Sequence, residues 1–226
     1  MLPMTSVPRI NTPAWCAHFD VRHYQDKAFV HYGIYFPPAL RKAVTGRKAE
    51  YLAGRLASRQ ALGTAGFPAF TLRSGAGREP LWPRNIIGSI SHCGSYALAL
   101  ASRQEVCHLR AIGLDIEMIF SEQRAARLWP KIISADEKAL LAQTSLPFHY
   151  AITLAFSLKE SLFKALYPTL KQHLSFHTAA ITALDLPAAQ INVCLEPALV
   201  AAGNFPANLT GHYYQHNHNV VTLLCF

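Results

Sequence analysis

The stretch FSLKESLFKAL, Phe156 to Leu166, predicts an amphipathic helix in the second half of the chain. Its leucine and phenylalanine residues recur near helical spacing, so one face of the helix is expected to be buried. Ser157 precedes Glu160 by three residues, which is the spacing of a capping box at a helix N-terminus. Glu160 and Lys164 also form an i,i+4 pair in the favourable order. Taken alone, the stretch is typical of a helix with a structural role. Whether its residues also take part in catalysis depends on the motifs in the rest of the chain.

The segments around this helix predict an α+β fold. Short strands are expected in HFDVRHYQ and HYGIYFP, then a helix that ends near Gly63, then two strands in SISHCGSYALALASR and HLRAIGLDIEMI. Further helices are predicted at 121–128 and from Ser134, which forms a second capping box with Glu137. The tail contains four strand-like runs: AITALDL, QINVCLE, LTGHYYQ and VVTLLCF. This order favours α+β over a regular βαβ sheet, with a domain boundary between residues 1–117 and 118–226.

The composition predicts a compact protein without a disulfide framework. With 226 residues, 51% of them hydrophobic and 15% charged, the chain can build one or two domains and leaves little disorder. No secretory signal is expected in MLPMTSVPRINTPAW, and no membrane span is expected along the chain. The five cysteines are scattered without a CxxC pair, which favours reduced thiols and a cytoplasmic location over disulfides or a zinc site.

The charge is distributed unevenly along the chain. The net charge is +8, and every lysine and arginine lies at or before Lys171, so residues 1–171 carry +10 and residues 172–226 carry −2. A basic segment joined to a near-neutral one indicates an anionic partner, such as a nucleic acid, a phosphorylated cofactor or an acidic protein. The alternative is a basic surface that serves only solubility.

Two acidic residues on a predicted strand indicate a metal site. Asp115 and Glu117, in IGLDIEMI, are two residues apart and therefore share one face, while Leu114, Ile116 and Met118 are expected to point into the core. Adjacent carboxylates repel unless a cation lies between them, and oxygen ligands suit Mg²⁺. Glu160 is a candidate third ligand. The alternative is a solvated face of an edge strand.

Two other groups of polar residues are weaker candidates. Ser91 and His92, next to Gly94, predict a loop that offers hydroxyl, imidazole and backbone N–H groups to a phosphate, although an ordinary turn is the alternative. His212, His216 and His218 fit no common spacing of zinc ligands and are expected on a strand surface.

Four motifs in a fixed order resemble the 4'-phosphopantetheinyl transferase family: GREPLWP, GSISHCGSYALAL, IGLDIE and FSLKESLFKAL. Together with RKAEYLAGRLASRQAL upstream, the residues of these motifs are most similar to the subgroup of enterobactin synthase component D, over roughly residues 47–166. The resemblance implies a pseudodimer of two similar α+β halves, with the active site in the cleft between them. It also implies transfer of the phosphopantetheine arm of coenzyme A to a serine of a carrier protein, with release of adenosine 3',5'-bisphosphate.

The resemblance assigns roles to individual residues. Asp115, Glu117 and Glu160 match three acids that bind Mg²⁺, and Glu160 is also the implied general base, directly or through water. Lys164 matches a lysine that contacts the phosphates during the reaction. Arg78 stands where many members have lysine. The further residues implied to contact coenzyme A are Arg47, Arg55, Arg59, Ser91, His92 and Lys159, in addition to Asp115, Lys164 and Arg78.

The implied partners are coenzyme A and apo carrier-protein domains, which are typically acidic and would dock transiently on the basic protein. The resemblance also implies a monomer that serves siderophore or other nonribosomal peptide synthesis, without nucleic acid as a partner. Two other functions remain open. A nucleic-acid-binding module would use the basic helix and would not need Asp115 or Glu117. A metal-dependent phosphoesterase would transfer the pyrophosphate of coenzyme A to water.

Overall fold

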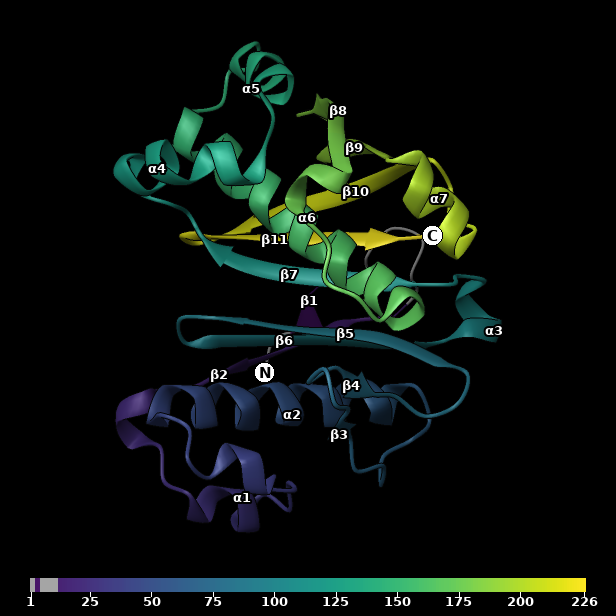
Figure 1. Cartoon of the computed structure of the whole chain (residues 1–226). Coiled ribbons are helices and arrows are strands. Elements are labelled where there is room, and N and C mark those ends of the chain that lie inside the picture. Colours follow the sequence, from purple (N-terminus) through teal and green to yellow (C-terminus); the bar gives the residue numbers. More distant parts are fainter. Residues whose placement is uncertain (1–2, 5–11) are drawn as a thin grey trace. The chain divides into compact units, whose positions relative to one another are not determined.

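The computed structural model describes residues 3–4 and 12–226, which fall into two compact units (Figure 1). The first unit spans Met1–Arg110 and the second spans Ala111–Phe226. Each unit contains an antiparallel sheet with a long helix packed on it. The predicted α+β class and its two α+β halves are therefore confirmed.

The predicted domain boundary after residue 117 is wrong, because strand β7 (Ile112–Met118) belongs to the second unit. Strand β7 pairs along its whole length with the last strand, β11 (Asn219–Cys225). Since these strands are about a hundred residues apart in the chain, the local sequence pattern gives no sign of their pairing.

In the first unit, a four-stranded sheet in the order β1-β2-β6-β5 carries helix α2 (Thr45–Thr64). Helix α2 buries Ala57, Ala61 and Leu62 against this sheet. The other elements of this unit are β1 (Pro3–Met4), β2 (Ala14–His18), α1 (Lys27–His31), β3 (Arg73–Ser74), β4 (Pro80–Leu81), β5 (Ile86–Cys93), β6 (Tyr96–Arg103) and α3 (Gln104–Cys107), with 3₁₀ turns at Val21–His23 and Pro38–Leu40.

Three strand predictions in this unit are wrong. HFDVRHYQ contains a 3₁₀ turn, because the Asp20 carboxylate accepts a hydrogen bond from the Arg22 backbone N–H at 2.9 Å and caps it. HYGIYFP contains no strand and begins at the end of helix α1. SISHCGSYALALASR is a hairpin of β5 and β6, which reverses at Gly94 with φ of 57°. Glycine adopts this left-handed conformation without the steric penalty of a side chain.

In the second unit, a five-stranded antiparallel sheet in the order β7-β11-β10-β9-β8 carries helix α6 (Phe148–Leu170). The four strands predicted in the tail are confirmed, although helix α7 (Pro197–Gly203) separates two of them. The predicted capping box of Ser134 and Glu137 is also confirmed. The remaining elements are α4 (Glu122–Ile132), α5 (Ala135–Ala142), β8 (Ala179–Asp185), β9 (Gln190–Leu195) and β10 (Asn208–His216), with a 3₁₀ turn at Phe176–Thr178.

Helix α6 begins after Pro147, so the predicted capping box of Ser157 and Glu160 is wrong. Ser157 lies more than two turns inside the helix and is fully buried. The apolar positions of the helix continue N-terminally through Ala151, Ile152 and Leu154, which are also buried. The motif that resembled a helix start is therefore the middle of a longer helix.

Gly113 lets helix α6 lie unusually close to β7. A Cβ atom at this position would lie 1.7 Å from the Ser161 carbonyl oxygen, so no other residue fits without displacing the helix. Ser157, Ser161 and Ala165 repeat at i, i+4 and i+8 and are buried. Because these side chains are small, the helix backbone and strand β7 pack closely.

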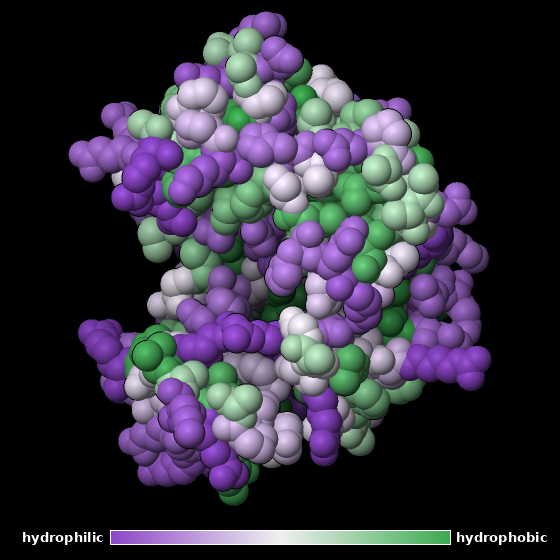
Figure 2. All heavy atoms as spheres, in the orientation of Figure 1, coloured by the Kyte–Doolittle hydropathy of each residue, from purple (hydrophilic) through white to green (hydrophobic). Residues whose placement is uncertain are grey.

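Figure 2 shows hydrophilic side chains spread over the visible face of the protein, with groups of apolar residues among them. Among the described residues, no helix is both long and apolar enough to cross a membrane. The five cysteines are free thiols, and only Cys225 is buried.

Candidate active site

In the second unit, strand β7 and helix α6 bring three carboxylates into mutual electrostatic range. Asp115 and Glu117 lie on β7, and Glu160 lies on α6. Asp115 is only 3% exposed, which rules out the alternative of a solvated edge-strand face for this residue. Leu114 and Ile116 are buried as predicted, whereas Met118 is half exposed and does not enter the core as predicted.

The environment disfavours negative charge on two of these acids. Burial, reinforced by the charge of Asp115, raises the pKa of Glu117 to about 7. Burial and the same neighbouring charge also raise the pKa of Glu160. Both shifts have the sign expected for carboxylates that are desolvated and held next to a like charge. A cation among the three groups would relieve this repulsion.

The donor set suits a hard cation such as Mg²⁺, which prefers carboxylate oxygens. However, within residues 3–4 and 12–226 no three His, Cys, Asp or Glu side chains are arranged to hold a metal ion. At least one of the predicted ligands Asp115, Glu117 and Glu160 would therefore have to change rotamer before all three could bind one ion. Their chemistry fits the metal, and in their present arrangement the charge on Asp115 disfavours charge on Glu117 and Glu160.

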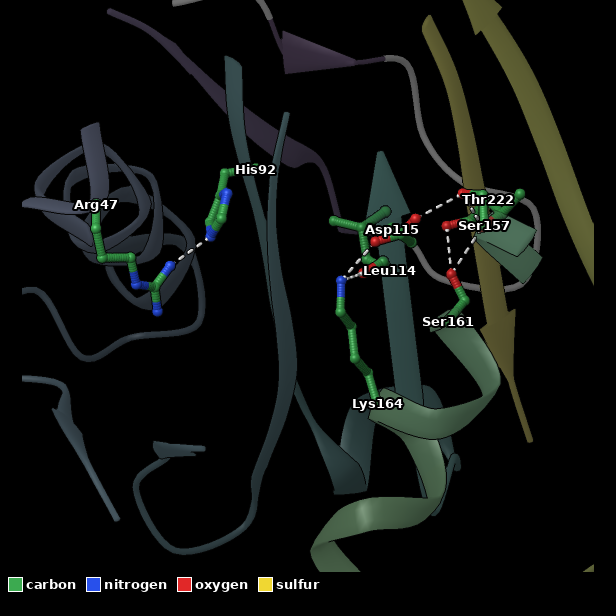
Figure 3. Close-up of polar contacts among 8 residues, drawn as sticks. All are labelled: Arg47, His92, Leu114, Asp115, Ser157, Ser161, Lys164 and Thr222. Carbon is green, nitrogen blue, oxygen red and sulfur yellow. Dashed lines mark hydrogen bonds and ion pairs between the residues drawn. The ribbon is translucent and has the colours of Figure 1, made fainter. Parts of the chain in front are cut away.

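Lys164 and Ser157 hold the Asp115 carboxylate from helix α6 (Figure 3). Lys164 Nζ lies 2.6 Å from Asp115 Oδ1 and donates a further hydrogen bond to the Leu114 carbonyl at 3.1 Å. Ser157 Oγ donates to Asp115 Oδ2 at 2.8 Å. The sequence predicted Glu160 as the i,i+4 partner of Lys164, whereas in the structure the ammonium group pairs with Asp115.

Lys159 is turned away from this group into the interior. Its Nζ lies 2.7 Å from Glu137 Oε1 and donates to the Ile132 carbonyl at 2.9 Å, and its side chain is 2% exposed. Glu137 also accepts hydrogen bonds from the Ser134 and Ile181 backbone N–H groups. The predicted contact of Lys159 with phosphate is wrong in this arrangement, because the ammonium group is committed to a buried ion pair.

A small pocket of about 140 Å³ opens beside Glu160. Its walls are largely apolar and include Phe163, Leu174 and Phe176. The rings of Phe163 and His173 stack with their centroids 5.7 Å apart and their planes at 7°. An uncharged, narrow group is the kind of ligand that such walls accept.

In the first unit, a groove of about 520 Å³ gathers four of the predicted basic residues. Arg47 and Arg55 reach it from helix α2, Arg78 from the turn between β3 and β4, and His92 from β5. Four groups that carry or can acquire positive charge in one groove make a site for a polyanion. This grouping agrees with their predicted use in binding a phosphorylated cofactor.

Arg47 and His92 contact each other across helix α2 and strand β5. Arg47 Nη1 lies 2.8 Å from His92 Nε2 (Figure 3), and the Glu50 carboxylate lies 3.4 Å from Arg47 and 3.6 Å from His92 Nδ1. Sequence reasoning missed Glu50. Its position three residues after Arg47, on the same helix face, is the signal that would have found it.

Arg55 and Arg78 differ in how the fold holds them. Arg55 is 7% exposed, stacks over the Tyr51 ring at 4.4 Å and donates to Ser74 Oγ at 2.7 Å. Burial lowers the pKa of Arg55, so a nearby anion would stabilise its charge. Arg78 is exposed and has φ of 67°, a left-handed conformation that is uncommon for arginine and aims its turn into the groove.

Two predicted residues lie elsewhere in the first unit. Ser91 lies inside strand β5 instead of in the predicted loop, and it faces away from helix α2 because it alternates with Ile90 and His92. Arg59 donates to the Tyr32 carbonyl at 2.5 Å and lines a separate pocket of about 230 Å³. Contacts of Ser91 and Arg59 with coenzyme A stay predictions.

Sequence reasoning also missed the residues behind Asp115. The sequence pattern predicts a helix cap at Ser157 and indicates no role for Ser161 or Thr222. The signal was present in both elements: small polar residues at i and i+4 of an apolar helix, and one threonine within the apolar run VVTLLCF.

Comparison with known proteins identifies the family. Residues 36–102 match the 4'-phosphopantetheinyl transferase N-terminal domain, and residues 111–216 match the 4'-phosphopantetheinyl transferase superfamily. Each match falls within one of the two units. The chain therefore belongs to the 4'-phosphopantetheinyl transferase superfamily and is an enzyme of that class, as the sequence motifs predicted.

Within this superfamily, the chain is similar to enterobactin synthase component D. It is 44% identical to the protein of that name from Salmonella typhi over 185 residues, which cover 82% of this chain and 74% of the relative. It is 49% identical to the Escherichia coli K12 protein of the same name over 129 residues, 56% of this chain and 58% of the relative. A solved structure, Thermotoga maritima holo-[acyl-carrier-protein] synthase, matches at 22% identity and a TM-score of 0.40, covering 52% of this chain and 62% of that chain.

Proposed function

We propose that this enzyme transfers the 4'-phosphopantetheine arm of coenzyme A to a serine hydroxyl of an apo carrier protein, requires Mg²⁺ and releases adenosine 3',5'-bisphosphate. The observation that carries the proposal is the group of Asp115, Glu117 and Glu160, with Lys164 bonded to Asp115. Phosphoryl transfer depends on neutralising phosphate charge and on positioning the nucleophile, and this group offers both.

Glu160 is the proposed general base. The serine oxygen forms a bond to the phosphorus next to the pantetheine arm, and the bond from that phosphorus to the bridging oxygen breaks. The electron pair of the broken bond leaves with adenosine 3',5'-bisphosphate, and Glu160 takes the serine proton, directly or through water. Its raised pKa supports this assignment, because a carboxylate with a pKa nearer neutrality is a better base.

Lys164 is the proposed cation for the charge that develops on the phosphate oxygens. Its contact with Asp115 holds the ammonium group near the acids, so little reorganisation is needed when the substrate binds. Mg²⁺ bound by Asp115, Glu117 and Glu160 would neutralise the pyrophosphate.

The groove in the first unit is the proposed site for the nucleotide part of coenzyme A. Arg47, Arg55, Arg78 and His92 line it, and Arg78 is the proposed contact for the 3'-phosphate. In the second unit, the apolar pocket beside Glu160 is suited to part of the uncharged pantetheine arm.

The proposed partners are acidic apo carrier-protein domains, which the monomeric enzyme binds transiently in the cytoplasm. The relatives named enterobactin synthase component D support a role in enterobactin-type siderophore synthesis.

The proposal is tested by mass spectrometry of apo carrier proteins after incubation with coenzyme A and Mg²⁺. We expect a mass gain of about 340 Da on a serine, the mass of the transferred phosphopantetheine group, with an equal amount of adenosine 3',5'-bisphosphate. EDTA should prevent both. Consumption of coenzyme A at the same rate without any carrier protein would identify a phosphoesterase instead.

A further inference from the structure

Behind the Asp115 carboxylate, three buried hydroxyl groups form a continuous chain (Figure 3). Ser157 Oγ lies 2.8 Å from Asp115 Oδ2 and 2.9 Å from Thr222 Oγ1. Thr222 Oγ1 in turn lies 2.8 Å from Ser161 Oγ. Ser157, Ser161 and Thr222 are all 0% exposed.

Counting protons fixes the direction of this chain. Asp115 is paired with Lys164 at 2.6 Å, so its carboxylate accepts hydrogen bonds and donates none. The single proton of Ser157 therefore points to Asp115, and Ser157 must accept from Thr222. Thr222 has then used its only proton and accepts from Ser161, whose single proton is shared with the Thr222 backbone carbonyl at 3.0 Å. The order is Ser161 to Thr222 to Ser157 to Asp115, in which each bond polarises the next.

The fold brings these hydroxyl groups together in the core, where their desolvation costs free energy. Thr222 is the register partner of Asp115 across β11 and β7. The two serines reach it because Gly113 allows helix α6 to lie close to β7. Buried hydroxyls must find partners to repay their desolvation, and apolar residues of similar size would avoid that requirement. Three of them joined in one chain that ends at the Asp115 carboxylate indicate that the orientation of this carboxylate is what they secure.

We propose that the chain Ser161–Thr222–Ser157 positions Asp115, with Ser157 restraining Oδ2 while Lys164 restrains Oδ1, so that the carboxylate is held in one orientation for binding a divalent cation. This inference rests on the proposed function, in which Asp115 is a ligand of Mg²⁺. The three hydroxyl residues are positioning residues, because they act through Asp115. Losing such an outer partner of a metal ligand typically weakens metal affinity about 10–100-fold.

A pair of opposite substitutions at position 222 separates positioning from packing. Thr222→Val keeps the shape and removes the hydroxyl, whereas Thr222→Ser keeps the hydroxyl and removes a methyl group. The probe is Mn²⁺, titrated into enzyme saturated with coenzyme A but without carrier protein, with free Mn²⁺ measured by electron paramagnetic resonance. We expect Thr222→Val to weaken Mn²⁺ binding at least about tenfold, and Thr222→Ser to bind as the native enzyme does.

The matched control is Thr153→Val, at a threonine that is also 0% exposed and lies on helix α6, which carries Ser157 and Ser161. Thr153 Oγ1 accepts from the Phe120 N–H at 2.9 Å and donates to the His149 carbonyl, outside the Asp115 chain. This variant should lower the melting temperature without changing Mn²⁺ affinity. Ser157→Ala should weaken Mn²⁺ binding more than Thr222→Val, and Ser161→Ala should weaken it least, because Ser161 is furthest from Asp115.

Asp115→Asn, measured in the same titration, distinguishes a failure of the positioning inference from a failure of the proposed metal site. If Asp115→Asn abolishes Mn²⁺ binding while Thr222→Val and Thr222→Ser both bind normally, the hydroxyl chain only fills space and the positioning inference is overturned. If Asp115→Asn binds Mn²⁺ as the native enzyme does, Asp115 is not a metal ligand, and the proposed function loses its metal site as well.

Discussion

Glu160 lies on helix α6 between the buried residues Lys159 and Ser161. Of these three side chains, Glu160 is the one that interacts electrostatically with Asp115. Because the helix begins at Phe148, Glu160 lies in the helix interior and does not cap the N-terminus. Its charge therefore contributes little to helix stability. Burial, reinforced by the charge of Asp115, raises the pKa of Glu160, so the ionised form is disfavoured in the absence of a cation. The close spacing of these buried acids lowers the stability of the metal-free protein and is typical of an active site.

Glu160→Gln should separate these two properties. We expect transfer to fall at least about 100-fold, because glutamine cannot accept the serine proton. The free energy of unfolding should change by less than about 1 kcal/mol, since glutamine preserves size and helix propensity. Carrier modification and urea unfolding, measured on the same preparation, check both expectations. An active Glu160→Gln enzyme would exclude Glu160 as the base.

Glu117 should make the stability of the metal-free protein depend on pH. Its pKa is raised from 4.5 to about 7 in the folded state, so the folded protein binds the proton more tightly than the unfolded chain. The resulting stabilisation is fully present below pH 4.5 and is lost as the pH rises through 7. We expect a loss of about 1–2 kcal/mol between pH 5 and pH 8, reduced by solvent screening of a partly exposed group.

The measurement is urea unfolding in EDTA at both pH values. Glu117→Gln should remove this part of the pH dependence, and Mg²⁺ should restore stability to the native protein at pH 8. Identical pH profiles for the native protein and Glu117→Gln would contradict the assigned pKa shift.

At the scale of elements, a buried ion pair ties helix α6 to its neighbours. Glu137 caps helix α5, accepts from the Ile181 N–H on β8 and pairs with Lys159 on α6, while Lys159 also reaches the end of α4 at Ile132. One carboxylate and one ammonium group thus join four elements around the helix that carries Glu160. Burial lowers the pKa of Lys159, and Glu137 opposes that shift.

Lys159→Met should therefore act on stability. Removing one partner leaves the Glu137 carboxylate buried without its counter-charge, which typically costs about 3–5 kcal/mol. The control is Lys131→Met on the exposed face of helix α4, where we expect less than about 1 kcal/mol. Urea unfolding gives both numbers. If Lys159→Met instead weakens coenzyme A binding with unchanged stability, the original prediction of a phosphate contact is restored.

At the scale of the whole molecule, positive charge is concentrated in the first unit. Residues 1–110 contain 14 Lys and Arg against 5 Asp and Glu, whereas residues 111–226 contain 7 against 8. The unit that holds the basic groove therefore carries +9, and the unit that holds the acids carries −1. Each unit has the sign that suits its proposed ligand: phosphate in the first, a divalent cation in the second.

Coenzyme A binding should consequently weaken as salt increases, because the field of the first unit is screened. We expect Arg78→Ala to weaken coenzyme A about 3–10-fold, which is about 0.7–1.4 kcal/mol for one exposed charged contact. The same variant should affect 3'-dephospho-coenzyme A less. Calorimetry at two salt concentrations checks both expectations, with the exposed Arg22→Ala as control. Equal losses for the two ligands would exclude a 3'-phosphate contact.

The sequence by itself determined the class of fold, the kinds of element and the family. The tail strands, the capping box at Ser134 and the helical face of α6 follow from periodicities of a few residues, which any local segment displays. The motif residues Asp115, Glu117, Glu160 and Lys164 could be proposed as one site through a resemblance carried by their order along the chain.

Only the tertiary structure decided what surrounds those residues. Ser157 contacts Asp115 and Thr222, which are 42 and 65 residues away, and Lys159 bonds to Ile132, 27 residues away. The unit boundary likewise depends on the pairing of β7 with the last strand of the chain. Local patterns specify which side of an element is buried, but not against which partner. Partners across such distances are selected by close packing and by the need of buried polar groups for hydrogen bonds, and both are properties of the assembled core.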